Sequence, residues 1–139
     1  PQTTFSSCFG APFMPLHPTK YAEMLSAKVE ETGVNVWLIN TGWNGQKKRM
    51  SLKDTRAVIN AALNGELDNA EFKQDKFFGF EVPVAIEGVD ADKLNPATSF
   101  ASEEAYEENA QILADKFKKN FEKFAEFATP ELLSGGPLI

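Results

Sequence analysis

Hydrophobic positions at helical spacing mark a helix near the start of the chain. Tyr21, Leu25 and Val29 recur every four residues, so they share one side of a helix with a 3.6-residue period. Gly33 follows the last of these positions, and glycine is the residue most often found just past a helix end. The pattern predicts a helix over about residues 18 to 32.

A longer apolar stripe predicts the clearest element, an amphipathic helix over about residues 102 to 127. Successive members of the stripe are three or four positions apart. They are Tyr106, Ala110, Leu113, Phe117, Phe121, Phe124 and Ala128. We expect Leu113 and the aromatic members to face the core, with Lys118, Glu122 and Glu126 in water. The alternative is a stripe that binds a partner protein or a membrane.

Between these two helices, the sequence predicts a strand and a further helix. Residues 34 to 40, VNVWLIN, are apolar or β-branched at almost every position, which is typical of a strand covered on both faces. A turn-rich loop follows at 41 to 49. Ser51, with Asp54 three positions on, forms a capping pattern for a helix that Asn64 and Gly65 end. The predicted apolar face of this helix comprises Leu52, Thr55, Ile59 and Ala62.

The remaining segments show weaker patterns. Residues 66 to 100 have little periodicity, and the stretch 77 to 86, FFGFEVPVAI, is the best candidate for extended structure. Residues 1 to 17 are rich in aromatic and small side chains and are interrupted by prolines. We expect this first segment to be an irregular, buried connector.

Charge and composition narrow the class of protein. The chain has 139 residues, with 14 basic and 20 acidic side chains and a net charge of −6. This balance argues against a nucleic-acid-binding protein or one bound to an acidic membrane surface, because both need a concentrated positive field. No apolar run approaches the roughly 20 residues that cross a bilayer, so a soluble protein is expected. The chain begins without methionine, which suggests that it was processed, cut or excerpted from a longer one.

Two single residues invite a catalytic interpretation. His17 is the only histidine and precedes a predicted helix, but no local residue offers it a catalytic partner. Cys8, the only cysteine, cannot close an internal disulfide and lies among phenylalanines, which would raise its pKa. We favour a structural histidine and a buried core cysteine in a reducing, intracellular protein over catalytic roles for either residue.

A cluster of basic and hydroxyl side chains at residues 47 to 56, KKRMSLKDTR, suggests ligand binding. It lies between the carboxyl end of the predicted strand and the amino end of the next helix, where α/β sheets bind ligands and free N–H groups attract anions. Arginine also stacks on purine rings. The alternative is that this cluster is an ordinary solvent-exposed loop before a capped helix and binds no ligand. The sequence has no phosphate-binding GxxxxGK[ST] loop and no HExxH metal motif.

Several long strings in the sequence are similar to those of one enzyme family. They are LHPTKYAE at 16 to 23, NTGW at 40 to 43, KRMSLKDTR at 48 to 56 and LNP at 94 to 96. With them, essentially the whole chain resembles the carboxyl-terminal segment of ATP-dependent phosphoenolpyruvate carboxykinase. Glycine usually precedes the Lys-Arg pair in that family, whereas Lys47 stands there in this chain, which predicts a stiffer nucleotide loop.

The resemblance implies a function and a site. Enzymes of the family are decarboxylating lyases of gluconeogenesis in the cytoplasm, which convert oxaloacetate and ATP to phosphoenolpyruvate, CO2 and ADP with Mg²⁺ and usually Mn²⁺. It implies that Arg49 and Met50 line the nucleotide, with Arg49 beside the adenine, and that Thr55 adds a polar contact. The catalytic residues, metal ligands and oxaloacetate-binding arginines of the family are expected upstream, so none is assigned here. ATP or ADP and oxaloacetate or phosphoenolpyruvate are then the expected partners, with no nucleic acid or membrane.

The expected fold is a mixed α/β, carboxyl-terminal part of a larger P-loop-type nucleotide-binding domain, ending in the long amphipathic helix. Residues 1 to 139 form one segment of that domain with no internal boundary. This segment alone is predicted to be inactive. The alternative is a standalone structural or interaction module that binds no nucleotide.

Overall fold

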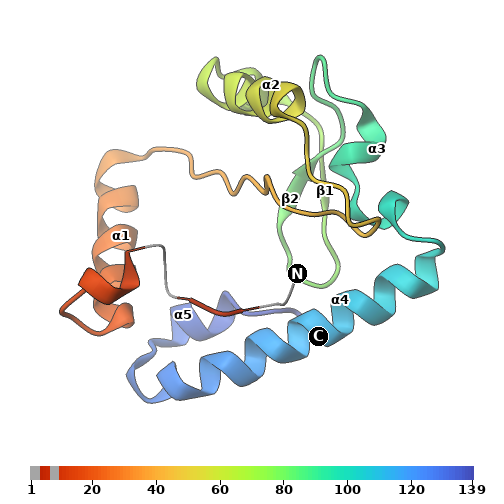
Figure 1. Cartoon of the computed structure of the whole chain (residues 1–139). Coiled ribbons are helices and arrows are strands. Elements are labelled where there is room, and N and C mark those ends of the chain that lie inside the picture. The colour runs from red at the N-terminus through yellow and green to blue at the C-terminus, as the bar shows by residue number, and fades with distance from the viewer. Residues whose placement is uncertain (1–3, 7–9) are drawn as a thin grey trace. The chain divides into compact units, whose positions relative to one another are not determined.

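Figure 1 shows the chain as a computed structural model, which describes residues 4 to 6 and 10 to 139. The described part is mixed, with several helices and a small two-stranded sheet, which agrees with the predicted α/β class. Its helices and strands are α1 (Pro18–Thr32), α2 (Leu52–Leu63), β1 (Phe72–Gln74), β2 (Glu81–Pro83), α3 (Ala91–Leu94), α4 (Glu103–Phe121) and α5 (Pro130–Ser134). Short 3₁₀ helices form at Ala11–Phe13, Glu66–Asn69, Pro96–Ser99 and Glu122–Phe127.

The chain divides into two compact units. The first comprises residues 1 to 36 and 118 to 136, and the second comprises residues 37 to 117 and 137 to 139. All three predicted site residues belong to the second unit. The prediction that residues 1 to 139 form one segment of a larger domain stays a prediction.

Helix α1 in the first unit confirms the predicted range of 18 to 32. Its amino end is capped by His17, whose Nδ1 lies 2.8 Å from Thr19 Oγ1 and accepts the Thr19 backbone N–H at 3.4 Å. Its carboxyl end is closed by Gly33, which adopts the left-handed φ of 64° and donates its N–H to the Val29 carbonyl. The sequence predicted this helix from its apolar periodicity and from Gly33, whereas the cap at His17 was not predicted.

The contacts of His17 agree with a structural role. Its ring lies 4.6 Å from the ring of Phe127 and 5.7 Å from that of Phe124, measured between centroids. The imidazole therefore caps one helix and packs on aromatic side chains of the same unit. Cys8 lies outside the described residues.

The expectation of a buried first segment is wrong for Phe13 and Leu16, whereas Phe5 and Met14 are half-buried. Phe13 is 89 % exposed and Leu16 is 52 % exposed. Aromatic composition indicated burial, but a proline-rich segment without periodicity presents no continuous apolar face that could pack.

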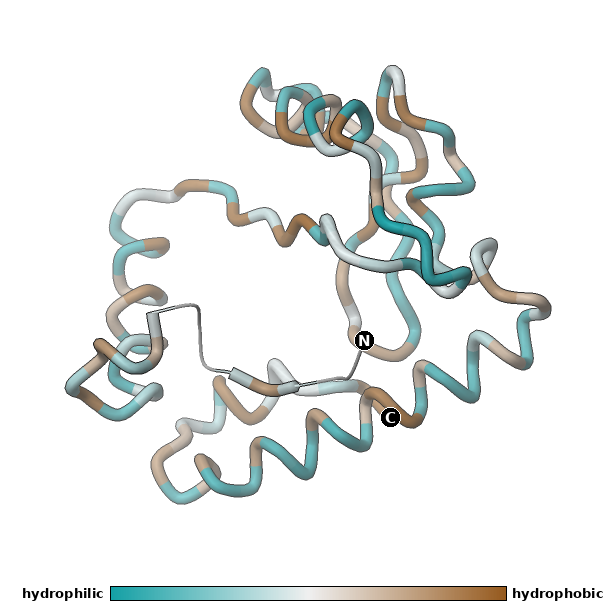
Figure 2. Tube along the Cα trace, in the orientation of Figure 1, coloured by the Kyte–Doolittle hydropathy of each residue, from teal (hydrophilic) through white to brown (hydrophobic). Residues whose placement is uncertain are grey.

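The predicted strand at 34 to 40 is also wrong. These residues have no strand structure, and the side chains of Val34, Val36 and Leu38 are 57, 59 and 76 % exposed. Figure 2 shows brown hydrophobic positions interspersed with white and teal ones along the connection that follows α1. A strand needs neighbouring strands for its backbone hydrogen bonds, and the sheet of the described residues contains β1 and β2 alone.

The sheet is an antiparallel pair in the second unit. Phe72 pairs with Pro83, Lys73 with Val82, and Gln74 with Glu81. Strand β2 falls in the stretch predicted to be extended, whereas β1 lies where the sequence showed no periodicity. The sheet therefore formed partly where it was expected.

A small core lies beneath α2 in the second unit. Ala61, Leu67 and Ile86 are buried, and the ring of Trp37 stacks on that of Phe72 at 6.0 Å. The buried residues of α2 are Asp54 and Ala61, whereas Leu52 and Ile59 of the predicted face are 75 and 38 % exposed. The helix range was predicted correctly, but the described residues leave much of its apolar face exposed.

The final helix is shorter than predicted and packs differently. Helix α4 ends at Phe121, and the 3₁₀ helix Glu122–Phe127 continues the predicted range. The fully buried positions of α4 are Ala110 and Ala114, while Phe117 is 44 % exposed and meets the edge of Phe78 at 6.0 Å between centroids. The expected burial of Phe117 is therefore wrong, because small alanines occupy the closest contacts of this helix and one side of the phenylalanine ring faces solvent.

Candidate functional site

The basic cluster begins in a tight hairpin that precedes α2. Trp43 and Arg49 form an antiparallel bridge, and the Asn44 N–H donates to the Lys48 carbonyl at 2.9 Å. The side-chain oxygen of Asn44 accepts the backbone N–H groups of Gln46, at 3.1 Å, and Lys48, at 2.9 Å. One asparagine carboxamide therefore fixes the inside of this turn. We call residues 42 to 50 the hairpin.

Lys47 at the tip of the hairpin adopts an unfavourable backbone conformation. Its φ of 58° makes it the only non-glycine residue with positive φ in the described part of the chain. The left-handed conformation costs an ordinary L-residue about 1 to 2 kcal/mol. Lys47 stands where the resembled family usually has glycine, so the substitution adds both a charge and backbone strain to the loop.

The hairpin is held against the segment that precedes α4. The Gly45 N–H donates to Ser99 Oγ at 2.9 Å. A Cβ atom at Gly45 would lie 2.6 Å from ring carbons of Phe100, closer than carbon atoms approach in proteins. Only glycine therefore allows this approach of the hairpin backbone to the aromatic ring.

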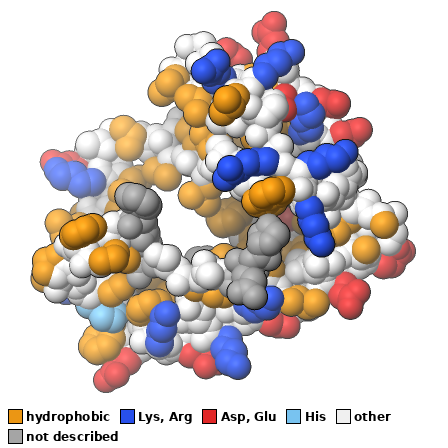
Figure 3. All heavy atoms as spheres, viewed as in Figure 1, with side chains coloured by type: hydrophobic (Ala, Val, Ile, Leu, Met, Phe, Trp, Pro, Cys, Tyr) orange, Lys and Arg blue, Asp and Glu red, His pale blue; other side chains and the backbone are white. Residues whose placement is uncertain are grey.

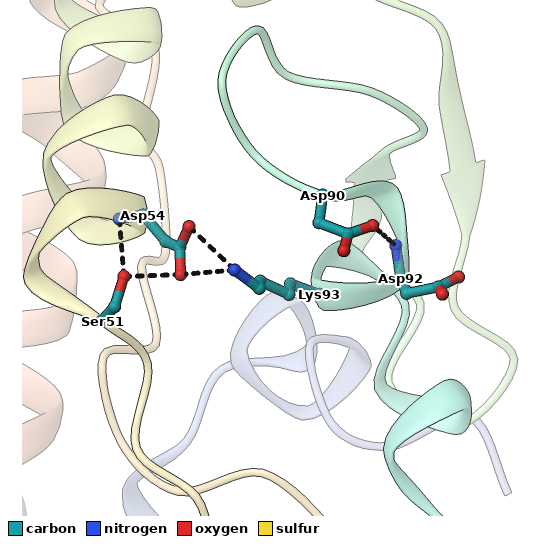
Figure 4. Close-up of polar contacts among 5 residues, drawn as sticks. All are labelled: Ser51, Asp54, Asp90, Asp92 and Lys93. Atoms are coloured by element: carbon teal, nitrogen blue, oxygen red, sulfur yellow. Dashed lines mark hydrogen bonds and ion pairs between the residues drawn. The ribbon is translucent and has the colours of Figure 1, made fainter.

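A polar cluster fixes the start of α2. The Ser51 hydroxyl accepts the Asp54 N–H at 3.0 Å and donates to Asp54 Oδ2 at 2.6 Å. Lys93, from α3, places its Nζ 3.1 Å from Oδ1 and 2.9 Å from Oδ2 of the same carboxylate. Figure 4 shows these contacts converging on Asp54 from two elements. Asp54 is only 4 % exposed, so its charge depends on these partners.

The electrostatics of the cluster follow from these contacts. The hydrogen bond from Ser51 and the charged one from Lys93 hold the pKa of Asp54 below its ordinary value, although burial acts in the opposite direction. Asp54 is therefore ionised at neutral pH and forms a charge-assisted pair with Lys93.

Short capping interactions set the position of Lys93. The Asp90 side chain accepts the Asp92 N–H at the start of α3. The Asn95 side chain caps the next short helix by accepting the Ala97 N–H, and the Thr98 hydroxyl donates to the Asp92 and Asn95 carbonyls. Lys93 therefore projects from a segment whose backbone is hydrogen-bonded at both ends.

All three predicted site residues lie along this hairpin and the first turn of α2. Arg49 is exposed, Met50 is half-buried and donates its N–H to the Gly42 carbonyl, and Thr55 is half-buried with its N–H bonded to the Ser51 carbonyl. Lys47, Lys48 and Arg49 form no ion pair with any described residue. Figure 3 shows Lys and Arg side chains gathered over α2 and the hairpin.

Sequence reasoning found Asp54 as a capping residue but missed its partner. Lys93 lies 39 positions away in a segment without periodicity, so no local pattern joins the two. Among the described residues, no group of three or more His, Cys, Asp and Glu side chains could hold a metal ion. None of the described helices is long and apolar enough to span a membrane.

Comparison with known proteins identifies the class. Residues 1 to 92 match the family model described as phosphoenolpyruvate carboxykinase, so the chain belongs to this family. Relatives named phosphoenolpyruvate carboxykinase (ATP) are 55 % identical in Flavobacterium johnsoniae, 49 % in Christiangramia forsetii and 49 % in Bacillus pumilus. The alignments cover 99, 99 and 100 % of this chain but 27 % of each relative. The resemblance predicted from the sequence is confirmed, and the chain spans about a quarter of the length of these relatives.

Proposed function

We propose that this chain is part of an ATP-dependent phosphoenolpyruvate carboxykinase and supplies the adenine side of its ATP site. The complete enzyme converts oxaloacetate and ATP to phosphoenolpyruvate, CO2 and ADP. The observation that carries the proposal is the alignment of nearly the whole chain, at 49 to 55 % identity, with proteins of that name. The family model also includes every residue of the hairpin and the first turn of α2.

The geometry of the hairpin supports the nucleotide role. Arg49 offers a planar guanidinium that stacks on a purine face, and Met50 offers a polarisable thioether for the same ring. Thr55 offers a hydroxyl that donates or accepts a hydrogen bond at the base edge. These three side chains come from seven consecutive residues whose backbone is fixed by the hairpin bridge and the helix cap.

The rest of the reaction needs groups from elsewhere in the enzyme. Phosphoryl transfer from ATP relies on phosphate clamps and on divalent cations, here Mg²⁺ and Mn²⁺. The described residues do not fit a metal site, because they hold no suitable cluster of ligands. In this proposal the metal ligands, the oxaloacetate-binding arginines and the P-loop lie in other parts of a larger nucleotide-binding domain in the cytoplasm. The enzyme acts on small molecules, with no nucleic acid or membrane partner.

The test is the affinity of the complete enzyme for ATP and oxaloacetate after substitution of Arg49. Arg49→Ala should weaken ATP binding by about 1 to 3 kcal/mol, or roughly 5 to 150-fold, because a stacking and charge-assisted contact is lost. Arg49→Lys should restore only part of the affinity, since an ammonium has no planar face. Oxaloacetate affinity should change little.

Thr55→Val provides a second, milder test of the same site. It keeps the shape of the side chain and deletes the hydroxyl, so ATP affinity should fall by about 0.5 to 1.5 kcal/mol. Unaltered ATP affinity in both Arg49→Ala and Thr55→Val would remove the hairpin from the nucleotide site. The basic side chains of residues 47 to 56 would then be ordinary solvent-exposed residues at the start of α2.

A further inference from the structure

Asp54 is a buried carboxylate, and Lys93 is its only ion-pair partner among the described residues. Ser51 is next to Asp54 on the same helix start, whereas Lys93 reaches it from α3. An isolated buried carboxylate is strongly unfavourable, so its counter-charge determines whether the first turn of α2 keeps this conformation. Lys93 therefore stabilises the start of a helix to which it does not belong.

The same segment also holds the other end of the hairpin. Ser99 accepts the Gly45 N–H at 2.9 Å, six residues after Lys93. Residues 90 to 99, which we call the brace, therefore hold the hairpin near its tip through Ser99 and the start of α2 through Lys93. Arg49 and Met50 lie between these two attachment points, and Thr55 follows Asp54 directly.

We propose that Lys93 is a positioning residue of the nucleotide site, acting through Asp54 to hold Arg49, Met50 and Thr55 in the geometry that binds the adenine. The inference rests on the proposed function of the hairpin. Its physical basis is that a displacement of about 1 Å in a binding constellation costs a large part of its effect, even when the altered residue touches no ligand. The family model ends at residue 92, so Lys93 lies just beyond the matched segment.

The experiment measures ATP and oxaloacetate affinity of the complete enzyme carrying Lys93→Met. This variant keeps much of the side-chain length and removes the charge. ATP affinity should fall by about 3 to 30-fold, the range of energetic coupling through packed networks, with oxaloacetate affinity unchanged. Lys93→Arg should restore most of the affinity, because a guanidinium also pairs with a carboxylate.

A matched control separates positioning from general loss of an ion pair. Lys76 pairs with Glu107 in the same unit but touches neither the hairpin nor the brace in the contacts described. Lys76→Met should leave ATP affinity unchanged. A double variant of Lys93→Met with Arg49→Ala should lose less ATP affinity than the product of the two single losses, since part of the effect of Lys93 passes through Arg49.

The outcomes distinguish the two proposals. If Arg49→Ala weakens ATP binding while Lys93→Met leaves it within about two-fold, the positioning role is wrong and the pair serves stability alone. If neither Arg49→Ala nor Thr55→Val changes ATP affinity, the proposed function of the hairpin fails whatever Lys93 does. Should Lys93→Met not fold, Lys93→Gln retains a hydrogen-bond donor, and its ATP affinity decides by the same criterion.

Discussion

At the scale of the residue, Lys47 shows how one side chain can conflict with its backbone. Glycine adopts a positive φ without steric cost, but Lys47 does so at the tip of the hairpin with φ 58°. The hydrogen bonds of the Asn44 side chain and backbone enforce this turn regardless of the residue at 47. Fewer backbone conformations are open to lysine than to glycine, and the expected stiffness of this loop stays a prediction.

Lys47→Gly should stabilise the complete protein. The left-handed strain of about 1 to 2 kcal/mol disappears, while the greater freedom of glycine in the unfolded chain costs about 0.5 to 1 kcal/mol. We expect a net gain of roughly 0.5 to 1 kcal/mol in the free energy of unfolding, measured by urea denaturation. Lys48→Gly is the matched control, because Lys48 has no positive φ and should lose stability. Equal effects at both positions would contradict strain at Lys47.

At the scale of the element, α2 depends on a charge in its first turn. The pKa of Asp54 is lowered in the folded protein, mainly by Ser51 and then by Lys93. A group with a depressed pKa contributes stability above its unfolded pKa and loses that contribution as the pH falls through its folded value. The start of α2 should therefore loosen in acid.

Asp54→Asn tests this pH dependence. At pH 7 the variant should lose about 1 to 2 kcal/mol of stability, because charged hydrogen bonds at a largely buried site are removed. The difference from the parent protein should begin to shrink below about pH 4 and vanish once Asp54 is protonated in both states. Unfolding curves across pH measure it. Asp92→Asn, at an exposed position of α3, should show no comparable loss, and a pH-independent difference for Asp54→Asn would argue against the ion pair.

At the scale of the whole molecule, apolar surface remains uncovered. The buried hydrophobic residues of the described chain are few, half of them are alanines, and none of the large side chains is fully buried. Leu38, Leu52 and Leu63 are 75 to 79 % exposed. A chain of this length can bury about two-thirds of its unfolded surface, so we expect other parts of the enzyme to cover these positions.

The isolated 139-residue chain should therefore behave differently from an independent domain. We expect it to bind a hydrophobic dye and to unfold without a sharp cooperative transition, because apolar side chains are exposed. We also expect no carboxykinase activity, because phosphoryl transfer needs phosphate and metal clamps that the described residues do not supply. Dye fluorescence, denaturation curves and an activity assay on this chain measure the three properties. A cooperative, monomeric fold without dye binding would instead favour a standalone module.

The sequence by itself determined the family and the local elements. Helices α1 and α2 have the predicted ranges because their apolar periodicity and the end signals at Gly33 and Ser51 are local to each helix. The strings around Arg49 and Thr55 were enough to predict the family that the comparisons confirm. The roles of these residues at a nucleotide stay a proposal.

Tertiary structure decided the features that depend on contacts between distant parts of the chain: strand formation, burial and the ion pair of Asp54. Residues 34 to 40 have the composition of a buried strand, but a strand forms only beside others, and the described chain provides none there. The exposure of Phe117 has the same cause. The apolar stripe of its helix predicts which side is hydrophobic, but it does not predict which part of the protein packs against that side. The pairing of Asp54 with Lys93 left no local signal, because an ion pair across 39 positions is produced by the fold and by no pattern of neighbouring residues.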